Sequence, residues 1–140
     1  MSQNLTYAST GLAGSDKPAN ALRVLVVEDE EVIRMLTDDI LSEEGFTVSQ
    51  VKDATEGLQY LCKQSHLCDL VLVDVRMPGP LDGIDFCSVV EEAWPHISIV
   101  IVSGYHTRAS LPRSAVLLQK PWRIDMLLAA VHTAQIKRRL

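Results

Sequence analysis

Short apolar runs alternate along the chain with segments whose apolar residues recur at helical spacing. Runs rich in Val, Ile and Leu, each bounded by polar or turn-forming residues, predict buried strands. The strands are expected at residues 22–27, 46–51, 69–74, 97–102 and 115–119. Helical spacing predicts helices at residues 30–44, from 53 to about 65, at 82–94 and from 123 onward.

Local signals support these boundaries. Asp53, followed three residues later by Glu56, has the spacing of a capping box and predicts a helix start. Gly45 is a natural helix stop, and Pro95 ends the helix that begins at Asp82. The first helix has its apolar residues at positions expected to share a face, namely Val32, Ile33, Leu36, Ile40 and Leu41.

Strand and helix alternate at a spacing typical of a parallel sheet with right-handed crossovers and helices on both faces. We therefore predict an α/β, doubly wound, five-stranded parallel sheet for residues 21–140. Between the last two strands, residues 106–114 include Pro112 and have no helical pattern, so a fourth helix is expected to be shortened or missing. Residues 1–20 are rich in Ser, Thr, Asn, Ala and Gly and predict a flexible N-terminal leader.

Composition narrows the class of protein. A chain of 140 residues that is 47% hydrophobic suits one folded domain. Its net charge of -5 argues against a general nucleic-acid or anionic-membrane surface. Three scattered cysteines indicate a reducing compartment rather than a disulfide framework. With no secretory signal and no long apolar run, a cytoplasmic protein is expected.

Polar residues follow four of the five predicted strands. The carboxyl ends of parallel strands meet along one edge of the sheet, so these residues are expected to converge. Three neighbouring carboxylates repel one another unless a cation lies among them, and oxygen ligands suit Mg²⁺. A hydroxyl and an ammonium group nearby suit a phosphoryl group. The pattern predicts a metal-assisted carboxylate that accepts phosphate, formed by Glu28, Asp29, Asp74, Ser103 and Lys120.

The same stretches resemble the receiver domain of two-component response regulators. They cover the whole predicted domain and comprise Val-Leu-Val-Val-Glu28-Asp29-Glu30, Leu-Val-Asp74-Val-Arg-Met77-Pro78, Asp82-Gly83, Ile-Val-Ser103-Gly104 and Lys120-Pro121-Trp122. The resemblance implies a flavodoxin-like fold and a signalling role rather than a metabolic enzyme, with at most slow autodephosphorylation. It implies that the partner upstream is a sensor histidine kinase or a phosphotransfer protein.

The resemblance also implies roles for individual residues. Asp74 would accept the phosphoryl group, and Ser103 and Lys120 would bind phosphoryl oxygens. Mg²⁺ would be held by the carboxylates of Glu28, Asp29 and Asp74 and by the backbone carbonyl of Arg76. The Lys120-Pro121 bond is expected to be cis, as it often is in this family.

The chain departs from the common receiver pattern in three places. Residues 79–81 form a loop one residue longer than usual, and Ser103 and Lys120 are only 120 − 103 = 17 positions apart. The family's aromatic switch position is occupied by Leu117, and Tyr105 is a candidate substitute. Arg76 and Tyr105 are expected to influence the lifetime of the phosphorylated form.

These motifs leave three functions open. We favour a single-domain response regulator whose output is the binding of a downstream protein. The alternative is a pseudo-receiver, an interaction module without phosphate cycling. A phosphohydrolase similar to haloacid dehalogenases would need a second Asp two residues after Asp74, where Arg76 stands. The four histidines have no metal-ligand spacing and are expected at the surface.

Overall fold

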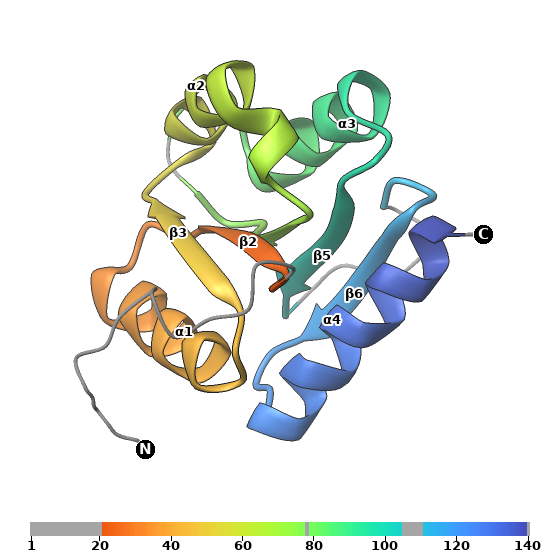
Figure 1. Ribbon diagram of the computed structural model, residues 1–140. Helices are drawn as coiled ribbons and strands as arrows, with labels where there is room; N and C mark the ends of the chain where they lie inside the picture. The colour runs from red at the N-terminus through yellow and green to blue at the C-terminus, as the bar shows by residue number, and fades with distance from the viewer. Residues whose placement is uncertain (1–20, 78, 105–110, 140) are drawn as a thin grey trace.

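The computed structural model describes residues 21–77, 79–104 and 111–139. Within them the chain forms five parallel strands and four α-helices (Figure 1). The strands are β2 (Arg23–Val27), β3 (Thr47–Val51), β4 (Leu70–Asp74), β5 (Ser98–Ser103) and β6 (Ala115–Gln119). The helices are α1 (Glu31–Glu43), α2 (Ala54–Gln64), α3 (Gly83–Ala93) and α4 (Ile124–Arg139), with a 3₁₀ turn, η2, at Ser65–Leu67.

The sheet has the order β3-β2-β4-β5-β6, and every pair of neighbouring strands is parallel. The strand order reverses direction at β2 and β4, so the crevice of this doubly wound sheet lies beyond the carboxyl ends of these two strands. The predicted α/β fold is confirmed. Element boundaries agree with the sequence prediction to within one or two residues, except that η2 was not predicted.

Helices cover both faces of the sheet, with α2 and α3 on one face and α1 and α4 on the other (Figure 1). Side chains alternate along each central strand, which gives two cores. In β4, Val71 and Val73 pack toward α2 and α3, whereas Leu70 and Leu72 pack toward α1 and α4. Phe86 of α3 is fully buried in the first core.

Helix starts follow the predicted capping chemistry. The Asp53 carboxylate accepts a hydrogen bond from the Glu56 backbone N–H at 2.8 Å, and the Glu56 carboxylate accepts one from the Lys52 N–H at 3.0 Å. Asp82 caps α3 by accepting from the Asp85 N–H at 2.8 Å. Gly45, with φ of 96°, ends α1 in the left-handed region that glycine adopts without strain.

The first helix differs from its expected burial. Leu41 is buried as expected, but Val32 and Leu36 are 76% and 48% exposed, and Thr37 is buried in their place. Thr37 is accommodated because its hydroxyl donates to the Ile33 carbonyl at 2.8 Å. The apolar positions of α1 are therefore divided between the core and a surface stripe.

The connection between β5 and β6 contains no helix in the residues that are described, Gly104 and 111–114. The Glu91 carboxylate on α3 accepts hydrogen bonds from the Ser114 backbone N–H at 2.7 Å and from its hydroxyl at 2.6 Å. Leu111 is buried in the core beside α2 and α3. These contacts attach the end of the connection to α3. Tyr105 and His106, like the predicted leader, lie outside the described residues.

Candidate phosphoacceptor and metal site

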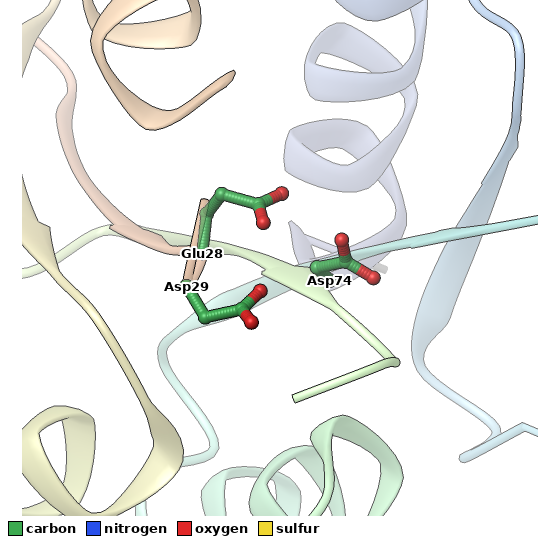
Figure 2. Close-up of side chains that lie close together, drawn as sticks. All are labelled: Glu28, Asp29 and Asp74. Atoms are coloured by element: carbon green, nitrogen blue, oxygen red, sulfur yellow. The ribbon is translucent and has the colours of Figure 1, made fainter. Parts of the chain in front are cut away.

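Three carboxylates meet at the carboxyl edge of the sheet, beyond the ends of β2 and β4. Glu28, Asp29 and Asp74 each offer an oxygen atom, and these atoms lie within 4.8 Å of one another. Glu28 and Asp29 follow β2, and Asp74 is the last residue of β4 (Figure 2). This convergence was predicted from the sequence because parallel strands end at the same edge of a sheet. In the structure, β2 and β4 are also neighbours in the sheet.

Burial distinguishes the three acids. Asp74 and Glu28 are only 4% and 6% exposed, whereas Asp29 is exposed to solvent. Burial, together with the neighbouring Asp74 and Asp29 carboxylates, raises the pKa of Glu28 to about 8. The Glu30 backbone N–H opposes this rise by donating to the Glu28 carboxylate at 3.1 Å. The cluster therefore has the charge and geometry that favour a bound cation.

Lysine 120 provides the positive charge of the site. Its Nζ atom donates to Asp74 Oδ2 at 2.8 Å, and its side chain is 37% exposed. The Lys120 backbone N–H donates to the Ser103 carbonyl at 2.9 Å, which ties the end of β6 to the end of β5. The Lys120-Pro121 peptide bond is cis, as expected.

Asp74 is held on its second oxygen by the backbone. The Arg76 N–H donates to Asp74 Oδ1 at 2.9 Å, so both carboxylate oxygens have a donor. Ser103, at the end of β5, is 2% exposed and aligns with Gln119 of β6, whereas Asp74 aligns with Val102. Ser103 and Asp74 therefore end neighbouring strands along the same edge.

Gly83 shows why the Asp82-Gly83 pair belongs to this site. A Cβ atom at Gly83 would lie 2.5 Å from the Asp74 carbonyl oxygen and 2.7 Å from the Val75 Cα atom. The Gly83 N–H donates to the Val75 carbonyl at 3.1 Å. The absence of a side chain lets the first turn of α3 pack directly against the backbone that carries the phosphoacceptor candidate.

The histidines that the structure describes and Leu117 are not members of this acidic cluster. The exposed His66, His96 and His132 do not contribute to the acidic cluster. Leu117 is half-buried and packs against the core beside α2 and α3.

Trp122 was not singled out as a site residue, yet it lines a small hollow together with Glu28, Asp74 and Lys120. Its place directly after Lys120-Pro121 is the sequence signal for that proximity.

The carboxylate cluster fits a hard divalent cation such as Mg²⁺. The three side chains offer oxygen ligands, and in the part of the chain that the structure describes their one ion-pair partner is the ammonium group of Lys120. Among the described residues, no helix has the length and apolar character needed to span a bilayer.

Comparison with known proteins agrees with this geometry. The sequence model of one protein family, the response regulator receiver domain, matches residues 24–132 of this chain. The chain is 28% identical over 114 residues to sporulation initiation phosphotransferase F of Bacillus subtilis, covering 78% of this chain and 90% of that protein. It is 35% identical over 94 residues to the alkaline phosphatase synthesis transcriptional regulatory protein SphR of Synechococcus elongatus, covering 62% of this chain and 36% of that protein.

A solved structure supports the same assignment. The response regulator receiver protein of Sinorhizobium medicae superposes with a TM-score of 0.76 at 26% identity, covering 85% of this chain and 98% of that chain. The chain spans between 24% and 36% of the length of three of the curated regulators it matches. Its fold, its acidic strand ends and these matches together show that the chain belongs to the response regulator receiver domain family.

Proposed function

We propose that this receiver domain accepts a phosphoryl group on Asp74 from a histidine kinase or a phosphotransfer protein, with Mg²⁺ bound beside it. The observation that carries the proposal is the convergence of Glu28, Asp29 and Asp74 with the ammonium group of Lys120, 2.8 Å from Asp74. Separate segments of the chain deliver these groups to one edge of the sheet. Such a set suits phosphoryl transfer, in which positioning and charge stabilisation dominate.

The groups of the site would have different chemical roles: metal binding, attack on phosphorus and binding of the phosphoryl oxygens. Glu28, Asp29, Asp74 and the backbone carbonyl of Arg76 would hold Mg²⁺, which supplies positive charge to the transferred phosphoryl oxygens. A carboxylate oxygen of Asp74 attacks phosphorus, forming an acyl phosphate as the P–N bond of a donor phosphohistidine breaks. Lys120 and Ser103 would then bind phosphoryl oxygens by ion pairing and hydrogen bonding.

Phosphorylation would change the contacts of Lys120. Its ammonium group, which pairs with Asp74 Oδ2, would face a group that carries about two negative charges. A shift of Lys120 and of Ser103 would move the ends of β5 and β6, because the Lys120 backbone N–H donates to the Ser103 carbonyl. We propose that the ends of these two strands transmit the change to a downstream protein partner, in a domain where Leu117 replaces the aromatic switch residue of the family.

The surface of α1 suits the upstream partner. Val32, Met35 and Leu36, hereafter the α1 stripe, are 76%, 51% and 48% exposed and lie one to two turns from the acidic site. Their spacing places them on one side of the helix. A helical partner that covers this apolar stripe would bring its phosphohistidine close to Asp74.

A phosphorylation assay separates this proposal from the pseudo-receiver. The full chain is incubated with a labelled low-molecular-weight acyl phosphate, with Mg²⁺ or with excess chelator, and intact-protein mass spectrometry counts the phosphoryl groups. We expect one phosphoryl group per chain with Mg²⁺ and far less with chelator. A chain that stays unlabelled in both conditions would instead support an interaction module without phosphate cycling.

A further inference from the structure

We propose that Arg34 is a positioning residue for the acidic pair Glu28 and Asp29. This inference rests on the proposed function, because its consequence is the affinity of the site for Mg²⁺. Arg34 lies on the first turns of α1 and is half-buried. It would act on the turn between β2 and α1, not on the phosphoryl group itself.

The key contact joins the Arg34 side chain to the backbone of the site. Arg34 Nη1 donates to the Glu28 carbonyl oxygen at 2.8 Å. Because the peptide unit is planar, holding this carbonyl oxygen also restrains the backbone N and Cα atoms of Asp29, which lie in the same plane. The Glu28 N–H donates to the Val51 carbonyl at 3.2 Å on the neighbouring strand β3. Glu28 is therefore held through both of its backbone groups.

The guanidinium group is itself held in place. Arg34 Nε donates to Gln50 Oε1 of β3 at 3.1 Å, and the Gln50 amide donates in turn to the Asp38 carboxylate of α1. The Ser42 hydroxyl donates to the other Asp38 oxygen at 2.7 Å. This chain of hydrogen bonds orients the planar donors of Arg34 before any ligand arrives, as supporting residues do in metal sites.

Two reasons favour positioning over general charge. The acceptor of Arg34 is a neutral carbonyl, and no ion pair of Arg34 with the three acids is seen among the described residues. The backbone N–H of Arg34 donates to the Glu30 carbonyl at 2.9 Å, and because variants of the side chain keep this bond, they leave the first turn of α1 closed. Loss of the guanidinium group would instead release the Glu28 carbonyl, in the turn that aims the Glu28 and Asp29 carboxylates at Asp74.

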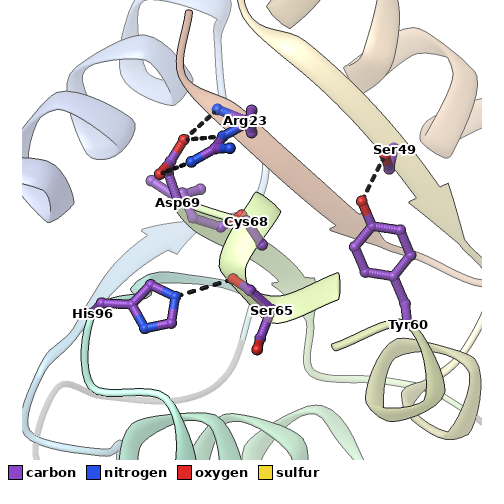
Figure 3. Close-up of polar contacts among 8 residues, drawn as sticks. Arg23, Ser49, Tyr60, Ser65, Cys68, Asp69 and His96 are labelled. Carbon is purple, nitrogen blue, oxygen red and sulfur yellow. Dashed lines mark hydrogen bonds and ion pairs between the residues drawn. The ribbon is translucent and has the colours of Figure 1, made fainter. Parts of the chain in front are cut away.

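The test compares Mg²⁺ affinity in matched arginine variants of the full chain. Isothermal titration calorimetry with MgCl₂ is applied to wild type, Arg34→Gln, Arg34→Lys and Arg23→Gln. Arg23 begins β2, the strand that Glu28 follows, and therefore lies at the opposite end of that strand. There it forms a bidentate ion pair with Asp69 (Figure 3). Arg23→Gln thus removes a stronger contact far from the acids. Thermal unfolding without metal verifies that each variant is folded.

We expect Arg34→Gln to weaken Mg²⁺ binding about tenfold, in line with the loss of groups that orient metal ligands. Arg34→Lys should lose less, because an ammonium group can still reach the Glu28 carbonyl. Arg23→Gln should bind as wild type does, even if it is less stable. Native affinity in Arg34→Gln, or an equal loss in Arg23→Gln, would overturn the inference.

A second variant and the wild-type titration complete the measurement. If Arg34→Gln does not fold, Gln50→Leu removes the anchor of Nε while keeping the Nη1 contact, and its Mg²⁺ affinity should fall by a smaller factor; unchanged affinity there would overturn the inference. If wild type binds no Mg²⁺, the proposed function fails and this inference fails with it. Wild-type binding that Arg34→Gln retains in full refutes the inference alone.

Discussion

Lys120 reaches across β5 to Asp74. The strands β4 and β6, which end at or just before these two residues, are not neighbours, yet Lys120 Nζ lies 2.8 Å from Asp74 Oδ2. The contact partly offsets the charge of a carboxylate that is 4% exposed and lies beside two other acids. Removing the ammonium group would leave Asp74 buried among like charges.

We expect Lys120→Met to lower the free energy of unfolding by about 1 kcal/mol, the modest size reflecting the partial exposure of the lysine. In an Asp74→Asn background the same change should cost much less, because the buried charge is gone. Urea denaturation of the two single variants and the double variant, without metal, measures this coupling. Strictly additive effects would show that the 2.8 Å contact contributes nothing.

Gly83→Ala should destabilise the protein because the new Cβ atom would meet backbone that cannot move away without disturbing the end of β4. The cost expected from such overpacking is roughly 1–3 kcal/mol. The matched control is Gly104→Ala, whose Cβ atom would have its nearest neighbour at 3.9 Å. Urea denaturation of both variants provides the comparison, and equal stabilities would contradict the role assigned to Gly83.

The ion pair at the other edge of the sheet gives a pH-dependent prediction. The hydrogen bonds from the Arg23 guanidinium hold the pKa of Asp69 below its ordinary value of 3.8. The pair therefore stabilises the folded state fully above that ordinary value, and its contribution is lost as pH falls through the lower pKa of the folded protein. Because both side chains are about one-third exposed, roughly 1 kcal/mol is expected at neutral pH.

Wild type and Asp69→Asn provide the measurement for this pair. Their difference in unfolding free energy, obtained by urea denaturation at several pH values from neutral down to about 3, should shrink toward the acid end of the range. A difference that stays constant or grows on acidification would contradict the assignment of the ion pair.

The α1 stripe should matter only for a protein donor. Met35→Glu is expected to reduce the rate of phosphorylation by a cognate kinase roughly tenfold, as a charge placed in an apolar contact does. Its phosphorylation by a small acyl phosphate should be unchanged, since the acids are untouched. Ile136→Glu, a similarly exposed position toward the end of α4, is the control. Equal kinase rates for Met35→Glu and wild type would exclude the stripe as a docking surface.

Much of the fold could be predicted from the sequence because its signals are local and repeated. The apolar run before Asp74 and the caps at Asp53 and Asp82 each fix an element without reference to the rest of the chain. The meeting of Glu28 and Asp74 followed from strand topology alone, since parallel strands end at the same edge.

The contacts that sequence reasoning missed depend on how elements face one another. Helical spacing alone could not show that α1 buries Thr37 and exposes Leu36, because the orientation of α1 is set by its packing on the sheet. Arg34 was overlooked for the same reason. Its partners, the Glu28 carbonyl and Gln50, come from the turn after β2 and from β3.

The most direct test of the central claim is the position of the phosphoryl group. Wild type, Asp74→Asn and Asp69→Asn are incubated with a labelled acyl phosphate and Mg²⁺, and incorporation per chain is measured. Asp69 lies just before β4 and Asp74 is its last residue, so the two variants remove carboxylates at opposite ends of this strand. We expect full labelling of wild type and Asp69→Asn and none of Asp74→Asn, whereas an Asp74→Asn protein that labels as wild type does would contradict the account.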